Sequence, residues 1–278
     1  MEWRTARRTI KIDRPLVMGI LNVTPDSFSD GGKFGASDVA IEHAERMVAD
    51  GVDIIDVGGE STRPGSSPVE SGVEIGRVVP VIRGITRRIS VPVSIDTTKS
   101  EVAAAAVDAG AEIVNDISGL RWDLRLADVA SATGAGVVLM HSRGSFATMH
   151  APPPDVDIVS DVVNALRGSI AAAKERGVPD ENIAVDVGIG FGKTLTQNLE
   201  LLRKLDTIVA EFETYPILIG TSRKSFIGRL LGNAPVEERL GGSIATAILA
   251  MQKGSKILRV HDVKETVQAL KIIDAIEK

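Results

Sequence analysis

The sequence predicts an α/β protein built around a closed barrel of eight parallel strands. Eight times along the chain, a short apolar run is followed by a polar or glycine-rich cluster and then by a helix-like stretch. The length of 278 residues is close to the ~250 typical of such a barrel. Aromatic residues make up only 3% of the chain, so Ala, Val and Ile must do most of the packing, as in strands buried on both faces. We therefore expect a TIM (β/α)8 barrel and a single domain over residues 1–278.

The eight expected strands are the apolar runs themselves. They lie at residues 16–21, 52–57, 91–95, 112–114, 136–140, 183–187, 216–219 and 256–260. Before them, residues 9–12 alternate between apolar and polar side chains, which is typical of a strand with one buried face. We expect this segment to form a short N-terminal strand or hairpin that closes the amino-terminal mouth of the barrel.

Helices are expected after each strand, with one extra helix before the last strand. Their predicted bounds are 37–50, 72–88, 99–109, 124–133, 158–176, 195–211, 224–231 and 263–277, and the extra helix covers 237–253. Ser37 is a candidate N-cap of the first helix, because serine oxygens accept from free N–H groups there. Gly51, Gly110 and Gly177 stand where C-caps are expected.

Composition excludes several classes of function. The formal charge of −5 argues against general nucleic-acid binding, although a local cluster of Arg and Lys can still bind an anion. There are no cysteines, which excludes disulfides, thiolate metal sites and a cysteine nucleophile. The N-terminus lacks the apolar core of a signal peptide, and no apolar run approaches the ~18 residues of a membrane span. We expect a soluble, cytoplasmic protein.

Three long loops follow strand ends, at residues 24–36, 61–71 and 142–154. Long loops inside a compact domain are usually lids or binding loops. In this class of barrel, the active site lies at the carboxyl ends of the strands. The loops and the residues that follow each strand are therefore the candidate functional face.

Asn22 ends the first strand. Its amide oxygen could bind a magnesium ion or a substrate hydrogen, and the alternative is that it only starts a turn. Thr62 and Arg63 follow the second strand, and Arg259 and His261 follow or end the eighth, which neighbours the first in a closed barrel. Two arginines (Arg63 and Arg259), His261 and the Asn22 amide meeting at one mouth together predict a diphosphate site, and the alternative for Arg63 is an exposed loop arginine.

Asp96, Asn115 and Asp186 end the third, fourth and sixth strands. Such residues commonly cap helices, but three acceptors around one cavity could also bind the edge of a nitrogen-rich ring. The spacing alone does not name the ring.

Two lysines follow strands in glycine-containing loops. Lys193 closes a segment that resembles a phosphate-binding Walker loop but is one residue too short, so we expect this lysine to face solvent at a helix start. Lys224 follows the seventh strand and could form a Schiff base or donate a hydrogen bond as a cation. We favour the hydrogen-bonding role, because Schiff-base lysines in barrels more often lie within a strand.

Seven motifs occur in order along the chain, at residues 18–32, 56–65, 94–97, 114–119, 188–193, 220–226 and 259–263. Together they resemble the motifs of the dihydropteroate synthases, a pterin-binding family of folate biosynthesis. The likeness covers essentially the whole chain. It implies a transferase that joins 6-hydroxymethyl-7,8-dihydropterin diphosphate to 4-aminobenzoate and releases diphosphate with the help of Mg2+. It also implies a homodimer and a sulfonamide target.

The resemblance implies a role for each matching position. Asp96, Asn115, Asp186 and Lys224 would bind the pterin edge, with Arg259 stacked over the ring, and Asp96, Lys224 and Arg259 would be catalytic. Asn22 would be the Mg2+ ligand, while Thr62, Arg63, Arg259 and His261 would hold the diphosphate. Phe28, Pro64, Phe191 and Ser225 would form the aminobenzoate pocket, which sulfonamides mimic.

Two positions depart from the family pattern: Val187 stands where proline is usual, and Ser142 where methionine is common. Neither change removes an implied ligand. Two alternatives stay open. A methyltetrahydrofolate methyltransferase would need no diphosphate site, and a regulatory pterin-binding paralogue would lack synthase activity.

Overall fold

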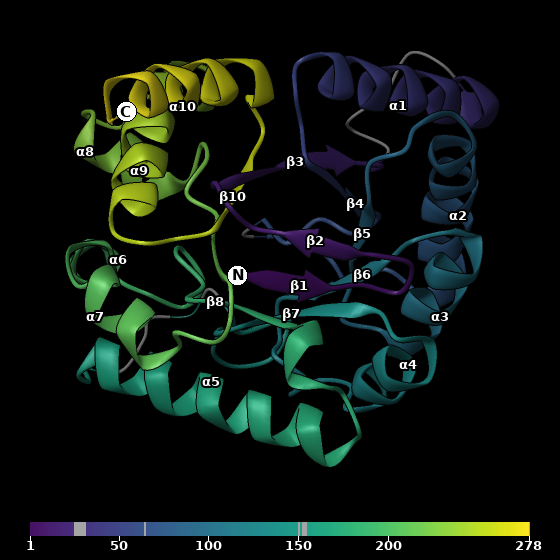
Figure 1. Cartoon of the computed structure of the whole chain (residues 1–278), viewed down its shortest axis with the longest axis horizontal. Coiled ribbons are helices and arrows are strands. Elements are labelled where there is room, and N and C mark those ends of the chain that lie inside the picture. Colours follow the sequence, from purple (N-terminus) through teal and green to yellow (C-terminus); the bar gives the residue numbers. More distant parts are fainter. Residues whose placement is uncertain (25–31, 64, 150, 152–154, 278) are drawn as a thin grey trace.

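The computed structural model describes the chain except for residues 25–31, 64, 150, 152–154 and 278. Its core is a closed barrel of eight parallel strands in the order β10-β3-β4-β5-β6-β7-β8-β9, which confirms the predicted fold class (Figure 1). The strands are β3 (Leu16–Asn22), β4 (Ile54–Gly58), β5 (Val93–Asp96), β6 (Ile113–Asp116), β7 (Gly136–Met140), β8 (Ile183–Asp186), β9 (Ile217–Ile219) and β10 (Ile257–Val260).

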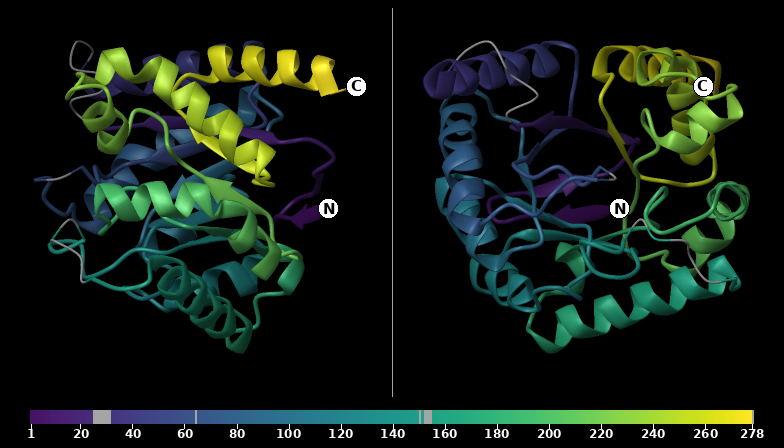
Figure 2. Two further views of the ribbon diagram at one scale, coloured as in Figure 1. Left: turned by 90° about the vertical axis from the view of Figure 1, so that its left-hand side faces the viewer. Right: turned by 180° about the vertical axis from the view of Figure 1, so that it is seen from behind.

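Helices form an outer ring around the barrel (Figure 2). They are α1 (Gly32–Ala49), α2 (Ser71–Arg88), α3 (Ser100–Ala109), α4 (Arg125–Thr133), α5 (Ile158–Glu175), α6 (Leu195–Arg203), α7 (Leu205–Glu211), α8 (Ser225–Leu230), α9 (Leu240–Gln252) and α10 (Val263–Glu277). Short 3-10 turns occur at η2 (Asp180–Asn182) and η3 (Val236–Arg239). The extra helix predicted before the last strand is α9, with η3 at its start.

The predicted helix ends are partly right. Gly51, Gly110 and Gly177 all follow helices with positive φ, as C-terminal glycines do. The prediction for Ser37 is wrong, since α1 begins at Gly32 and Ser37 lies inside it. The poor helix propensity of its first glycine hid this start from the sequence pattern. The single helix expected over 195–211 is two helices that meet at Lys204.

The N-terminal segment is a hairpin, in which β1 (Glu2–Arg4) pairs with β2 (Thr9–Lys11). Figure 1 shows the two strands crossing the opening of the barrel. Trp3 is fully buried there among the barrel's inward-facing residues, and its indole N–H donates to the Asn182 carbonyl at 3.0 Å. The hairpin therefore closes the amino-terminal mouth, as predicted.

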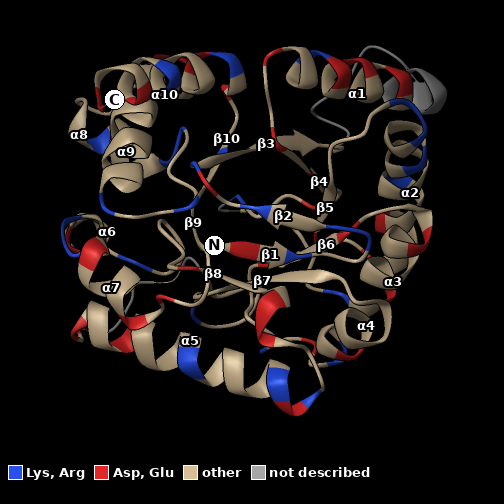
Figure 3. Cartoon of the chain, in the orientation of Figure 1, with Lys and Arg blue, Asp and Glu red and all other residues tan. Residues whose placement is uncertain are grey.

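Strand register brings the polar strand ends to one level. Asn22 pairs with Gly58, Gly58 with Asp96, and Asp96 with Asn115 across four neighbouring strands. Elsewhere the strands are almost entirely apolar and buried, and charged residues of both signs lie on the outer helices (Figure 3). Within the described part of the chain, no helix combines the length and the apolar character needed to cross a membrane.

Candidate active site

Arg259 lies at the centre of the carboxyl-terminal mouth of the barrel. Its Nε donates to Asp56 Oδ2 and its Nη2 donates to Asp96 Oδ2, both at 2.6 Å. Asn115 Nδ2 donates to the same Asp56 oxygen at 3.0 Å. Three strands, β4, β5 and β6, are thereby linked to β10 through one guanidinium and its two carboxylates.

The charges in this array perturb one another because they are buried. Burial raises the pKa of Asp96 above its ordinary value, while the Arg259 charge opposes the rise and the Asp56 charge adds to it. For Arg259, burial acts to lower the pKa, but the Asp56 and Asp96 carboxylates outweigh it and the pKa is raised. Arg259 is therefore a permanent cation, and its bonds to Asp56 and Asp96 hold the guanidinium in one orientation at the mouth.

Asp56 is fully buried and was not predicted from the sequence. Its position inside the apolar run 52–57 makes it look like part of an ordinary buried strand. The available signal was the charge itself, because an acidic residue in a strand buried on both faces needs a buried partner. That partner is Arg259.

Lys224 and Asp186 occupy the opposite side of the mouth. The Lys224 ammonium donates to the Ile189 carbonyl and lies 4.7 Å from the ring centre of Phe191. Burial lowers the pKa of Lys224 to about 8, although the Asp186 carboxylate acts to raise it. Burial also raises the pKa of Asp186, against the charge of Lys224. The contacts favour the hydrogen-bonding role expected for Lys224.

The Val187 departure leaves the turn after Asp186 intact. Asp186 Oδ1 accepts from the Gly188 N–H at 2.7 Å, and Val187 is fully buried. Gly188 has φ +68, and a Cβ there would lie 1.8 Å from the His141 carbonyl oxygen. Close approach of the two loops therefore requires glycine, and the bond from Gly188 orients the Asp186 carboxylate without a proline.

The Ser142 departure gives the two neighbouring loops a new contact. Ser142 Oγ donates to the Ile117 carbonyl at 2.7 Å and accepts from Arg121 Nη2 at 2.8 Å. The bond to Ile117 is buried, whereas the bond from the exposed Arg121 is partly buried.

A cavity of about 440 Å³ opens in front of Arg259. Its lining brings together eight of the predicted residues: Asn22, Thr62, Arg63, Asp96, Phe191, Lys224, Arg259 and His261. Asn115 and Asp186 are not part of the lining; they lie at the ends of β6 and β8 and are only 3% and 5% exposed. Ser225 lines an adjoining cavity of about 890 Å³, which shares Arg63, Lys224 and His261 with the first. Phe28 and Pro64 lie outside the described residues.

His261 is held by Ser222 at the side of this cavity. The His261 N–H donates to Ser222 Oγ at 3.1 Å, and the Nδ1 of the ring lies 3.1 Å from the same oxygen. Burial lowers the pKa of His261 to about 4, and the charges of Arg259, Arg223 and Arg63 add to this effect. The imidazole is therefore neutral near pH 7 and can offer one N–H to a ligand.

The loop after β4 is held in place by a half-buried lysine. Lys99 Nζ donates to Glu60 Oε1 at 2.8 Å and to Glu74 Oε2 at 2.5 Å. Glu60 lines the cavity and also accepts from the Val69 N–H at 2.5 Å. Sequence analysis did not single out this network, which fixes the start of the segment that carries Thr62 and Arg63.

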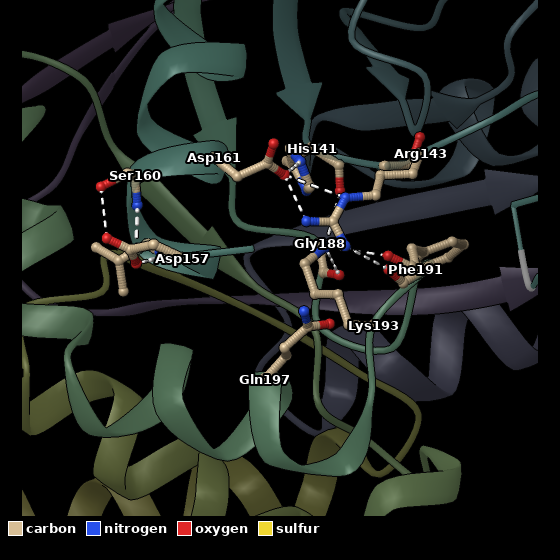
Figure 4. Close-up of polar contacts among 12 residues, drawn as sticks. His141, Arg143, Asp157, Ser160, Asp161, Gly188, Phe191, Lys193 and Gln197 are labelled. Atoms are coloured by element: carbon tan, nitrogen blue, oxygen red, sulfur yellow. Dashed lines mark hydrogen bonds and ion pairs between the residues drawn. The ribbon is translucent and has the colours of Figure 1, made fainter. Parts of the chain in front are cut away.

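The prediction that Lys193 faces solvent is wrong. Its ammonium donates to the carbonyl oxygens of Gly188, Phe191 and His141 at 2.7, 3.1 and 3.3 Å (Figure 4). The loop turns its carbonyls inward at positive-φ glycines, so they surround the lysine that follows them. A sequence pattern does not show where loop carbonyls point.

The residues present suit a magnesium ion that arrives with a phosphorylated ligand. The described residues contain no group of three or more His, Asp or Glu side chains placed to hold a metal. Asn22 supplies an amide oxygen at the cavity wall. Mg2+ usually keeps several waters and is held through one or two carboxylates and substrate phosphates, so an ion beside Asn22 would take most of its ligands from water and phosphate.

Fold and site together define a barrel enzyme whose carboxyl-terminal mouth combines the buried carboxylates of Asp56 and Asp96 with the exposed cation of Arg63. Residues 18–261 match the family model described as "Pterin binding enzyme". A dihydropteroate synthase of Clostridium beijerinckii is 49% identical over 95% of both chains. The solved dihydropteroate synthase of Xanthomonas albilineans with 4-aminobenzoic acid covers 100% of this chain and 99% of its own, with 42% identity and a TM-score of 0.92. The Yersinia pestis dihydropteroate synthase with a sulfonamide drug complex gives 42% identity and a TM-score of 0.91, with coverage of 100% and 99%.

The chain belongs to the pterin-binding enzyme family and, within it, to the dihydropteroate synthases. Its reaction class is accordingly that of a transferase in folate biosynthesis. The family expected from the seven motifs is confirmed.

Proposed function

We propose that this chain condenses 6-hydroxymethyl-7,8-dihydropterin diphosphate with 4-aminobenzoate, giving 7,8-dihydropteroate and diphosphate. The observation that carries the proposal is the Asp56–Arg259–Asp96 array at the back of a cavity whose rim holds Arg63 and His261. A flat ring with N–H donors needs carboxylates at one end of its site, and a diphosphate needs cations at the other. The cavity offers both.

In this proposal the pterin edge faces the acidic end of the site. Asp96, Asn115 and Asp186, at the ends of β5, β6 and β8, would supply the oxygens that accept N–H bonds from the ring. Lys224, on the same side of the mouth as Asp186, would supply a cationic donor. Arg259 would lie over the ring face, where a guanidinium plane stacks well on a π-system.

The diphosphate would lie at the cationic end, against Thr62, Arg63, Arg259 and His261. Asn22 would hold Mg2+ there, and the bound ion would offset the negative charge of the leaving diphosphate. Arg63 lies in the loop after β4 and is exposed at the rim of the cavity, so its guanidinium is open to a ligand.

The reaction replaces a C–O bond by a C–N bond. As the bond between the pterin methylene and the diphosphate breaks, positive charge develops on the methylene and negative charge on the leaving group. Asp96 is placed to stabilise the first, and Arg63 and Arg259 the second. The aromatic amine attacks the methylene through its lone pair and then loses one proton. No covalent enzyme intermediate is required.

The 4-aminobenzoate would bind where the two cavities meet, beside Phe191 and Ser225. Phe28 and Pro64 belong to the same proposed pocket and lie outside the described residues. Support comes from the solved Xanthomonas relative, which contains 4-aminobenzoic acid. The loop that follows β4, at residues 61–71, would close over the site and exclude water, which would otherwise trap the developing cation. Of the other loop expected to do so, 24–36, residues 25–31 lie outside the described residues and residues 32–36 belong to α1.

The proposal is tested by measuring diphosphate release from the pterin diphosphate in the presence of Mg2+, with and without 4-aminobenzoate. Stimulation by the amine, with formation of dihydropteroate, is the expected result. Release that ignores the amine would instead favour a pterin-binding protein without synthase activity. We further propose a single domain, which the length of the chain supports, and a cytoplasmic location, which the absence of cysteine suits. The family resemblance implies a homodimer formed through the outer helices.

A further inference from the structure

The loop between β8 and α6, residues 188–193, is folded around the ammonium of Lys193. The Lys193 nitrogen lies within hydrogen-bonding distance of three carbonyl oxygens, those of Gly188, Phe191 and His141, which matches the three N–H bonds of its protonated form. Burial lowers the pKa of Lys193 well below its ordinary value, and the Asp186 carboxylate acts to raise it. Two of these acceptors belong to the loop itself, and the third belongs to the end of β7. Lys193 therefore closes the loop on itself and attaches it to the neighbouring strand.

A second cation holds the same loop from outside. Arg143 Nη1 donates to the Gly192 carbonyl at 3.1 Å, while its Nε and Nη2 donate to Asp161 Oδ2 at 3.1 and 2.7 Å. Asp161 is on α5, and the same oxygen lies 3.1 Å from His141 Nε2. In Figure 4, Asp161 points toward both His141 and Arg143. Helix α5 thereby anchors the arginine that anchors the loop.

The backbone of this loop explains why such anchors matter. Gly188, Gly190 and Gly192 have φ values of +68, +85 and +59, in the left-handed region that glycine adopts readily. Three alternating glycines leave a six-residue segment with many accessible conformations. A unique conformation must come from contacts. The loop N–H groups of Gly188 and Gly190 donate to Asp186 Oδ1 and Asn198 Oδ1 at 2.7 and 2.6 Å, and the two cations bind its carbonyl oxygens.

The loop carries one wall of the proposed amine pocket. Phe191 lines the cavity in front of Arg259, and its ring lies 4.7 Å from the Lys224 ammonium. Lys224 in turn donates to the Ile189 carbonyl of the same loop. A shift of the loop would move the Phe191 ring, whereas Lys224 is carried by the start of α8.

We propose that Lys193 and Arg143 are positioning residues that set the affinity of the site for its aromatic amine substrate by holding Phe191 in place. This inference rests on the proposed function, because it assigns a wall of the 4-aminobenzoate pocket. Neither residue needs to touch the substrate. Lys193 acts through the carbonyls of the loop, and Arg143 acts through Gly192.

The test is a steady-state comparison of Lys193→Met and Arg143→Gln with the unmodified protein, varying each substrate in turn. Lys193→Met keeps the length of the side chain and removes its donors. The KM for 4-aminobenzoate is expected to rise at least tenfold in Lys193→Met and at least threefold in Arg143→Gln. In both variants kcat should stay within about threefold of its original value, and the KM for the pterin diphosphate should change less than that for the amine.

Lys204→Met is the matched control. Lys204 lies between α6 and α7, and in the described part of the chain its ammonium forms an ion pair with Glu200 at 2.9 Å. The KM values of this variant should therefore not change. Circular dichroism establishes that each variant is folded. Arg143→Gln alone decides the matter if Lys193→Met does not fold.

The possible outcomes separate the two proposals. An unmodified protein that forms no dihydropteroate would overturn the proposed function. An active protein whose folded variants keep the original KM for the amine would overturn the positioning role. Equal rises in both KM values would also overturn it, since they would indicate a general loosening of the site.

Discussion

Asp56 offers the sharpest single perturbation of the site. The substitution Asp56→Asn keeps the shape of the side chain and removes its charge. The Asp56 Oδ2 atom accepts from Arg259 at 2.6 Å and from Asn115 at 3.0 Å. Its Oδ1 atom is buried without a hydrogen-bond partner among the described residues. An asparagine that keeps its oxygen at the first position must bury its NH2 group at the second.

The expected loss follows from these contacts. A hydrogen bond to a charged group contributes about 1.5–3 kcal/mol. Arg259 keeps its bond to Asp96 at 2.6 Å, so the loss should be smaller than the 3–5 kcal/mol of a buried charge left alone. We expect about 2 kcal/mol of lost transition-state stabilisation, which corresponds to a fall in kcat/KM of about 30-fold.

The assay is initial-rate diphosphate release at several pH values. The Asp56 charge contributes to the raised pKa of Asp96. A raised carboxyl pKa means that activity is lost as pH falls through it, so Asp56→Asn should move this acidic limb to lower pH. Asp53→Asn is the matched control, because Asp53 pairs with Arg14 at the amino-terminal end of the same strand. An Asp56→Asn variant with unchanged kcat/KM and an unchanged acidic limb would refute the role given to the array.

Three further predictions concern the same face of the barrel. Asp96→Ala, Lys224→Ala and Arg259→Ala should each lower turnover at least tenfold, or about 1.4 kcal/mol of barrier; near-original rates in all three would contradict the assigned site. The pKa of Lys224 is lowered to about 8, so its ammonium is present below that pH. In a pH–rate profile, kcat/KM should therefore fall as pH rises through 8. The variant Lys224→Arg should remove this fall or shift it to higher pH. Gly188→Ala should reduce the unfolding free energy by about 3 kcal/mol or more in urea titrations, because φ is +68 and the new Cβ would meet a carbonyl oxygen at 1.8 Å. Gly168→Ala, on a helix with nothing within 4 Å, should leave stability equal or higher, and an equal loss in both glycine variants would argue against the close contact.

The strand positions could be predicted because each apolar run ends in a polar cluster, and only buried strands show that pattern eight times. The same regularity hid Asp56, which sits one residue before the end of an apolar run and pairs with an arginine 203 positions away. Pairing across a barrel depends on closure and register, and neither is written in local sequence.

The predictions for Lys193 and Ser37 were wrong for related reasons. Lys193 follows a glycine-rich segment, and the direction of its side chain depends on carbonyl groups that sequence patterns do not describe. Ser37 has good N-cap chemistry, but the backbone continues as helix to Gly32. Local preference is a weak guide wherever backbone contacts outside the segment decide its conformation.

The central claim is that strand ends far apart in the sequence form one site for a pterin and its diphosphate. A crystal structure of the protein soaked with the pterin diphosphate and Mg2+ tests it most directly. We predict the ring edge against Asp96 and Asp186, and the phosphates against Arg63 and His261 with Mg2+ beside Asn22. A ligand bound in a different cavity, or with its phosphates at the acidic end, would contradict this account.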